Sequence, residues 1–434
     1  MLTYIKNSFV LLALIVGAGF ISCKKSDGFA HNPSQPMVVN SFAPAAGPLG
    51  TEILIKGSNF TTDTSKIKVS INGVRLLVVR VKGDEIMAVI TTKTGSGPIQ
   101  VDIDKGTVAS ADPFNYQFSY SVSTLAGSGQ AGYSDGKGTG ASFNFNGVRG
   151  QLCVDKDLNV YVADGGNQRV RKVAADGTVS TIAGSGINGY ADGAAAAAQF
   201  NNPCGTAVDK DGNVYVSERN GRNIRKITPD GVVSTYAHGS GNGGNELTSV
   251  VINPTTGEIY WSDFYGDGIY YLHNGNVEKI INHSLPCTLT IDGQGNIYAT
   301  HYDDQQVWKY TYDAASATFD GGVAIAGTSH VGGMDDGIGL AATFARPWGI
   351  AIDSKGNLYV SGQGGGDKSN NVRLITAGTW AVTTIAGVGD NTGFIDGLGY
   401  DARFNRPTGI AVDKNNDLYV LDMDNNRIRK ITVQ

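Results

Sequence analysis

Side chains that can bind a cation or a ligand recur at one fixed place along residues 121–434, three positions after a regularly spaced tyrosine. The six residues at this place are Asp164, Glu218, Asp263, His301, Gly362 and Asp422. Carboxylates that converge on one point can hold a divalent cation such as calcium. Carboxylates that repeat at one point more often hydrogen bond the backbone of their own turns. The informative members are therefore the two that break the acidic pattern, His301 and Gly362.

Arginine and aromatic side chains form a second candidate set in the same region. These residues are Arg149, Trp261, Tyr265, Tyr302, Arg346, Trp348 and Arg406. Aromatic faces can stack on sugar rings, and arginine offers a fork of N–H donors to polar groups. If these residues meet at one opening, they predict a binding site for a polar ligand. Trp261 and Trp348 have an alternative role as packing between strands.

Motifs for other chemistries are weak in this sequence. Residues 209–213 begin like a calcium loop, but no glutamate closes the loop at its twelfth position, so a hairpin turn is favoured. His301 and His330 alone do not make a zinc site. No nucleophile elbow or phosphate-binding loop is visible. We therefore predict no cofactor beyond a divalent cation such as calcium, for which Glu218, Asp263 and Asp422 are the candidate ligands, and we favour binding over catalysis.

Six repeats of one strand pattern must position these side chains. In each repeat an apolar strand ends in Asp or Asn, and a second strand carries the tyrosine six residues later, or seven in the third repeat. The residues that end the first strands are Asp155, Asp209, Asn253, Asp292, Asp353 and Asp413. A third and a fourth strand follow, as at 169–173 and 179–184. Six units of four antiparallel strands predict a six-bladed β-propeller. The pattern resembles NHL repeats over residues 121–434.

The ends of this region predict how the ring closes. The chain stops at Gln434, directly after the third strand of the sixth repeat, and residues 121–127 have the sequence of a fourth strand. We expect this N-terminal strand to complete the last blade and leave no open edge there. Four long loops between repeats share an Asp-Gly pair and a phenylalanine, which favours a structural role for these residues.

Residues 37–120 predict a smaller β-domain ahead of the propeller. About seven short strands alternate with turn residues, among them Asn72-Gly73, and this spacing is typical of a two-sheet sandwich. The ordered turn residues from Phe42 to Gly73 resemble the IPT/TIG family of immunoglobulin-like domains. The resemblance implies a spacer or an interaction module, and the fold class predicted for the whole chain is all-β.

The N-terminus has the features of an export signal. Residues 1–22 combine Lys6 with an apolar run, and Phe20-Ile21-Ser22-Cys23 resembles a bacterial lipobox, which implies a lipid on Cys23. Residues 23–36 are polar and predict a flexible tether. The other cysteines, Cys153, Cys204 and Cys287, lie in strand-like segments and are expected to be buried free thiols.

Composition and resemblance together limit the function. The net charge of −5 argues against nucleic-acid binding. Exported lipoproteins with IPT/TIG and NHL parts accompany glycan-uptake systems in some Gram-negative bacteria. The resemblance thus implies a lipid-anchored outer-membrane protein, on the cell surface or the periplasmic face, that binds a glycan or another small polar ligand at the propeller mouth. We expect this protein to be a monomer. The alternatives are a metal-dependent lactonase-like hydrolase or lyase, and a scaffold for other envelope proteins.

Overall fold

The computed structural model describes residues 31–433 apart from 91–93, 148, 240–245, 267, 284, 363–368 and 390–391. The predicted signal peptide 1–22 and the predicted lipidation site Cys23 lie outside the described residues. The chain divides into two compact units, Met1–Gln117 and Phe118–Gln434. Apart from short 3-10 turns, the described residues form strands and loops. No helix within the described residues has the length and hydrophobicity of a membrane span.

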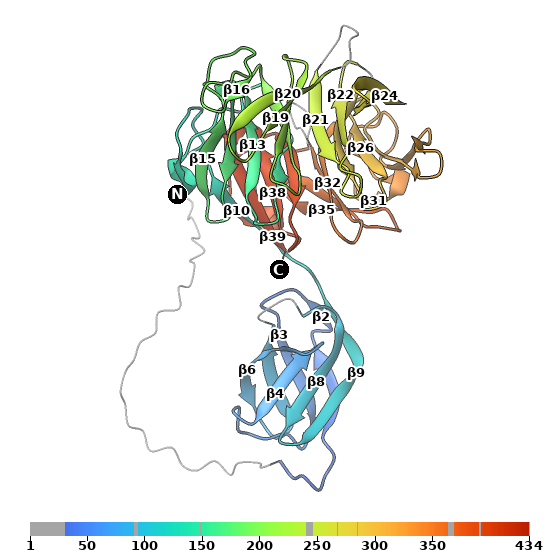
Figure 1. The fold of residues 1–434 in the computed structure, drawn as a ribbon. Helices are drawn as coiled ribbons and strands as arrows, with labels where there is room; N and C mark the ends of the chain where they lie inside the picture. The colour runs from blue at the N-terminus through green and yellow to red at the C-terminus, as the bar shows by residue number, and fades with distance from the viewer. Residues whose placement is uncertain are drawn as a thin grey trace, which may run out of the picture. The chain divides into compact units, whose positions relative to one another are not determined.

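The first unit is the predicted sandwich of two sheets (Figure 1). One sheet has the order β1-β3-β7-β6, with β1 (Val38–Ala43), β3 (Glu52–Ser58), β7 (Glu85–Val89) and β6 (Leu77–Val81). The other has the order β2-β9-β8-β4-β5, with β2 (Ala46–Gly47), β9 (Gly106–Tyr116), β8 (Gly97–Ile103), β4 (Ile67–Ile71) and β5 (Val74–Arg75). Alternate residues such as Ile53, Ile55, Val69 and Val101 are fully buried and form one core between the sheets.

Asn59 fixes the segment that precedes the sandwich. Its side chain donates hydrogen bonds to the carbonyls of Asn32 at 2.9 Å and Gln35 at 2.7 Å, and it accepts one from the Asn32 N–H at 2.8 Å. The part of the predicted tether that the structure describes, residues 31–36, is therefore hydrogen-bonded to the sandwich.

Six antiparallel sheets form the described part of the second unit, and each is one blade of a β-propeller, as predicted (Figure 1). The first blade contains β12 (Cys153–Val154), β13 (Val160–Asp164), β14 (Arg169–Val173) and β15 (Thr178–Ala183). The second contains β17 (Pro203–Val208), β18 (Val214–Glu218), β19 (Asn223–Ile227) and β20 (Val232–His238). The third contains β21 (Leu247–Ile252), β22 (Ile259–Asp263), β23 (Gly268–His273) and β24 (Asn276–Asn282). The fourth blade contains β25 (Pro286–Ile291), β26 (Ile297–His301), β27 (Gln306–Tyr310) and β30 (Val323–Ala326). The fifth contains β32 (Pro347–Ile352), β33 (Leu358–Gly362), β34 (Val372–Ile375) and β35 (Ala381–Ala386). The sixth contains β37 (Pro407–Val412), β38 (Leu418–Asp422), β39 (Arg427–Val433) and β10 (Tyr120–Ala126).

Short elements decorate these blades. Two-residue strands from the loops between blades extend four of the sheets: β11 (Gly136–Lys137), β16 (Gly193–Ala194), β31 (Gly337–Ile338) and β36 (Gly397–Leu398). The fourth blade adds a hairpin of β28 (Tyr312–Asp313) and β29 (Thr318–Phe319). The 3-10 turns are η1 (Gly138–Gly140), η2 (Gly165–Asn167), η3 (Gly339–Ala341), η4 (Gly399–Asp401) and η5 (Met423–Asn425).

The ring is closed by a strand from the other end of the unit. β10 pairs antiparallel with β39, from Tyr120 opposite Val433 to Ala126 opposite Ile428. It thereby supplies the fourth strand of the sixth blade and covers the edge that β39 would otherwise expose.

Neighbouring blades approach most closely at the inner strands. A Cβ atom at Gly349 would lie 2.1 Å from the carbonyl oxygen of Thr408 in the next blade, so only glycine fits there. The second strand of every blade is buried at each position, because both of its faces contact neighbouring blades. The propeller mouth, defined here as the end where inner strands begin and second strands end, is built on these rigid elements.

Candidate ligand-binding site at the propeller mouth

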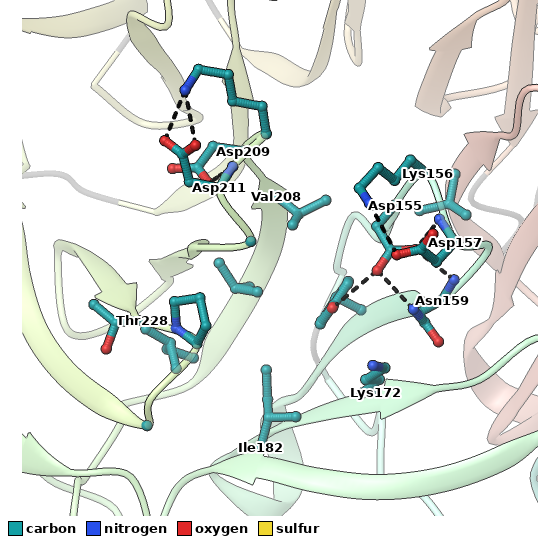
Figure 2. A pocket seen from close by; sticks show the side chains of 18 residues that line it. Asp155, Lys156, Asp157, Asn159, Lys172, Ile182, Val208, Asp209, Asp211 and Thr228 are labelled. Carbon is teal, nitrogen blue, oxygen red and sulfur yellow. Dashed lines mark hydrogen bonds and ion pairs between the residues drawn. The ribbon is translucent and has the colours of Figure 1, made fainter.

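A cleft of about 820 Å³ lies at the end of the propeller opposite to the mouth, between the first and second blades (Figure 2). Figure 2 shows Asp155 and Asp157 on one side and Asp209 and Asp211 on the other. The two inner carboxylates hold their own hairpins: Asp209 accepts from the N–H groups of Asp211 and Asn213, and Asp155 does the same in its blade. The predicted hairpin turn at 209–213 is therefore confirmed. The same bonds recur at Asp292, Asp353 and Asp413 in other blades. We therefore interpret the acids that line the cleft as structural residues of the hairpins.

Most of the repeated acids near the mouth are partners of buried arginines. Arg171, Arg225 and Arg429 each bind one fully buried acid at the end of the second strand and one partly exposed aspartate of an Asp-Gly loop. The inner acids are Asp164, Glu218 and Asp422, and the loop aspartates are Asp135, Asp192 and Asp396. Each guanidinium also lies about 5 Å from the loop phenylalanine, which is buried. The predicted structural role of these loops is confirmed.

This arrangement corrects the expectation that Glu218, Asp263 and Asp422 converge as cation ligands. Glu218 and Asp422 are fully buried and held by arginine, and burial raises the pKa of both, that of Asp422 to about 6. Asp263 is buried as well and accepts from the N–H groups of Glu246 and Gly266. Each acid thus caps backbone or pairs with arginine within its own blade, and none of the three faces an open mouth.

The prediction that Trp261 offers a stacking surface is also wrong. The Trp261 side chain is fully buried against Ala207, Tyr215 and Val250 in the core between the second and third blades. The reason is its place inside β22, whose residues are all buried.

Six residues from four blades meet at the mouth, and we call them the mouth cluster. They are Arg149, Phe264, Tyr265, Tyr302, Arg346 and Trp348. The ring of Trp348 lies 5.5 Å from that of Phe264 and 5.9 Å from that of Tyr302. Five of the six were predicted site residues; Phe264, which directly follows β22 as Tyr302 directly follows β26, was missed.

Arginines border this aromatic surface. The guanidinium carbon of Arg149 lies 5.1 Å from the centre of the Trp348 ring, and that of Arg346 lies 5.2 Å from the centre of the Tyr302 ring. Trp348 itself is fully buried, so the accessible aromatic surface belongs to Tyr265, which is 59 % exposed, and to the half-buried Tyr302. The prediction that Trp348 stacks on a ligand is therefore wrong: its buried ring packs beneath the guanidinium of Arg149.

Two further ion pairs lie at the same end of the propeller. Arg406 pairs with Asp424 at 3.5 Å in the sixth blade, and Arg219 pairs with Glu246. Among the described residues, the buried indole N–H of Trp348 and the buried hydroxyl of Thr408 have no hydrogen-bond partner. Both belong to inner strands that begin at the mouth.

One buried side chain links the inner strands across the ring. The buried side chain of Gln151 donates from Nε2 to the carbonyl of Leu289 at 2.9 Å and accepts from the hydroxyl of Ser249. Because Gln151 belongs to the first blade and Leu289 to the fourth, this side chain crosses the ring.

His301 belongs to a different group from the one expected. Its Nε2 lies 2.9 Å from the hydroxyl of Tyr310, and its ring centre lies 3.8 Å from that of His283. His283 in turn bonds Asp304 at 2.9 Å. His330, the other histidine considered from the sequence, has its Nε2 3.8 Å from Asp304 Oδ1, and its backbone N–H donates to the carbonyl of Asp304 at 2.9 Å.

Comparisons with known proteins agree with this architecture. A model of the IPT/TIG domain matches residues 37–120, and a model of the NHL repeat matches residues 404–431. Human NHL repeat-containing protein 2 is 24 % identical over 347 residues, which cover 66 % of this chain and 46 % of that protein. The chain spans less than half the length of the curated relatives it matches first.

Solved structures from Bacteroides thetaiotaomicron share the fold. One, described as a protein of unknown function, is 24 % identical with a TM-score of 0.62 and covers 93 % of this chain and 100 % of its own. Another, described as an auxiliary nutrient binding protein, is 21 % identical with a TM-score of 0.60, over 93 % of this chain and 99 % of its own. Residues 37–120 are therefore an IPT/TIG domain, and the six-bladed propeller that follows carries an NHL repeat at 404–431.

Proposed function

We propose that this protein is a non-catalytic, lipid-anchored ligand-binding protein of the cell envelope whose propeller mouth binds a glycan. The observation that carries the proposal is the mouth cluster, in which the half-buried ring of Tyr302 lies beside Arg346 and the exposed ring of Tyr265 packs against Phe264. Arg149 lies over the ring of Trp348 in the same cluster. Sugar rings offer apolar C–H faces to aromatic surfaces and hydroxyls to N–H donors.

The buried acids favour binding over metal-dependent hydrolysis. A lactonase-like mechanism needs carboxylates that face the mouth and can hold a divalent cation. Glu218 and Asp422 instead bond Arg225 and Arg429 inside their blades. Two of the three acids that the sequence offered to the alternative hydrolase or lyase are therefore bound to arginine inside their blades.

Location and ligand class rest on further support. The lipobox-like sequence that ends at Cys23 supports a lipid anchor in the outer membrane, and the description of one of the two Bacteroides thetaiotaomicron proteins as an auxiliary nutrient binding protein supports a nutrient ligand. A Cys23→Ala variant should move from the membrane fraction to the soluble fraction. Continued membrane attachment of this variant would contradict the anchor.

Isothermal titration calorimetry of the full-length chain with a panel of polysaccharides tests the proposed glycan binding. We expect saturable binding to at least one member, weakened about tenfold in Tyr265→Ala because a stacking surface is lost. Tyr400→Ala is the matched control, since Tyr400 is 63 % exposed but lies on the outer η4 turn. Absence of binding across the panel would overturn the proposal that the ligand is a glycan. Product formation that a chelator abolishes would overturn the non-catalytic role.

A further inference from the structure

Two histidines and an aspartate converge in the fourth blade from three separate segments. His283 lies in the short connection between β24 and β25, His301 ends β26, and Asp304 lies in the turn between β26 and β27. One ligand atom from each residue lies within 4.8 Å of the ligand atoms of the other two. The three side chains thus form one compact group of two imidazoles and one carboxylate.

Specific contacts orient this group. His283 Nε2 lies 2.9 Å from Asp304 Oδ2, while His283 Nδ1 lies 2.6 Å from the hydroxyl of Tyr310. The same hydroxyl lies 2.9 Å from His301 Nε2. Tyr310 is fully buried, so it holds both imidazoles in place from the inside of the blade. Outer-shell bonds of this kind orient histidines that ligate metals.

The fourth blade differs here from the blades with arginine. The register places Trp308 opposite Ala299, where Arg171 stands opposite Val162 in the first blade. His301 occupies the position of the inner acid, and its ring centre lies 5.9 Å from that of Trp308. A position that elsewhere holds a carboxylate bonded to arginine therefore holds a nitrogen donor beside aromatic rings.

We propose that His283, His301 and Asp304 bind a divalent transition-metal ion of the zinc class. Donors bound to one zinc ion at about 2.0–2.2 Å are at most about 4.4 Å apart, so small side-chain rotations complete the site. Two nitrogens and one carboxylate suit zinc and its first-row neighbours, whereas calcium takes six to eight oxygens. The ion takes the place of the proton between His283 Nε2 and Asp304 Oδ2, and the bound neutral ring carries its one proton on Nδ1, facing the hydroxyl of Tyr310.

The site has a route to solvent and room for a further ligand. The side chains of His283 and Asp304 are 17 % and 21 % exposed, whereas His301 is fully buried. His330 lies on the loop after β30 with its Nε2 3.8 Å from Asp304 Oδ1, and its side chain is exposed. Three protein ligands with a fourth position open to water or to His330 is a common arrangement for zinc.

Titration of the full-length chain with zinc chloride tests this site, with the chain purified without an oligohistidine tag. We expect one zinc ion per chain, with binding at least about tenfold weaker in His283→Gln and in Asp304→Asn. His273→Gln is the matched control, because His273 is exposed at the end of β23 and should leave binding unchanged. Calcium chloride should give no heat at this stoichiometry.

Cobalt(II) gives a second readout that depends on coordination. We expect the wild-type chain to give the visible absorption of nitrogen-coordinated cobalt, and Asp304→Asn to lose it while keeping the thermal unfolding temperature of the wild type. Asp304 lies on a half-exposed turn, so this variant keeps the test valid even if changes at buried His301 disturb folding. Absence of stoichiometric zinc binding, or unchanged binding in both His283→Gln and Asp304→Asn, would overturn the proposal.

Discussion

Replacing Arg429 by methionine should destabilise the propeller more than the same replacement of Arg373. Both guanidiniums are buried, and each bonds two backbone carbonyls and one loop aspartate that is a little over 40 % exposed. Arg429 also bonds Asp422 at 2.7 Å, and that carboxylate is fully buried. Gly362 stands at the matching place in the fifth blade, so Arg373 has no inner acid. The two arginines therefore differ chiefly in one buried carboxylate.

The expected magnitudes follow from what each change leaves behind. Arg373→Met leaves two carbonyls without their donor and one aspartate that water can solvate, a loss of about 1–3 kcal/mol. Arg429→Met leaves the same groups and also a buried, unpaired carboxylate, and breaking such a pair costs about 3–5 kcal/mol. We expect a difference of about 2 kcal/mol at neutral pH.

The penalty for Arg429→Met should also depend on pH. Burial already raises the pKa of Asp422 to about 6, and removal of Arg429 raises this pKa further. An unfolded aspartate has a pKa of about 3.9, so the folded variant binds the proton first as the pH falls. Proton uptake by the folded state stabilises it, and the penalty should shrink from about pH 8 toward about pH 5.

Urea unfolding followed by tryptophan fluorescence measures these differences in the propeller alone. All four tryptophans, Trp261, Trp308, Trp348 and Trp380, lie in that unit. The double variant Arg429→Met with Asp422→Asn should recover part of the loss, because it removes the stranded charge. Equal losses in the two single arginine variants, or a larger loss for Arg373→Met, would refute this account of the buried acid.

Other predictions concern packing, thiols and ring closure. Gly349→Ala should destabilise the propeller by about 1–3 kcal/mol in the same assay, whereas Gly140→Ala, whose Cβ meets no atom within 4 Å, should change stability by less than about 0.5 kcal/mol. Cys204 and Cys287 should resist alkylation until the chain unfolds, because both thiols are buried. Burial also raises the pKa of both thiols, that of Cys204 to about 12. Rapid alkylation of the native chain would contradict this prediction. Deletion of residues 118–126 should lower the unfolding temperature, because the edge of β39 loses its partner; an unchanged temperature would show that β10 is dispensable.

The repeats made the fold predictable. The spacing between Asp or Asn and Tyr marks a hairpin of fixed length, and Asp155, Asp209 and Asp292 hold that hairpin through the same side-chain bonds. A feature that the backbone needs in every blade leaves a periodic signal in the sequence. The sandwich was predictable for a related reason, since both central residues of the Asn72-Gly73 turn have the positive φ that this pair favours.

The candidate site was predictable only where position along a strand determines direction. Counting to the strand starts placed Arg149, Arg346 and Trp348 at one mouth, because each inner strand begins there. The count did not show that Trp348 lies beneath Arg149, since burial depends on packing between blades. His283 was missed because it lies in a short connection without repeat features, and its partners His301 and Asp304 belong to the next blade.

The closing strand also determines how the protein responds to mechanical tension. β9 ends at Tyr116 and β10 begins at Tyr120, so a pull on the N-terminal part of the chain is delivered directly to the ladder between β10 and β39. Tyr120 pairs with Val433 at the blade end opposite to the mouth, whereas Asp422 and Arg427 lie at the mouth end. A force between an object held at the mouth and the N-terminal chain therefore runs along the strands. It shears the hydrogen bonds of this ladder together instead of opening them one after another, which makes the pairing of β10 with β39 resistant to extension.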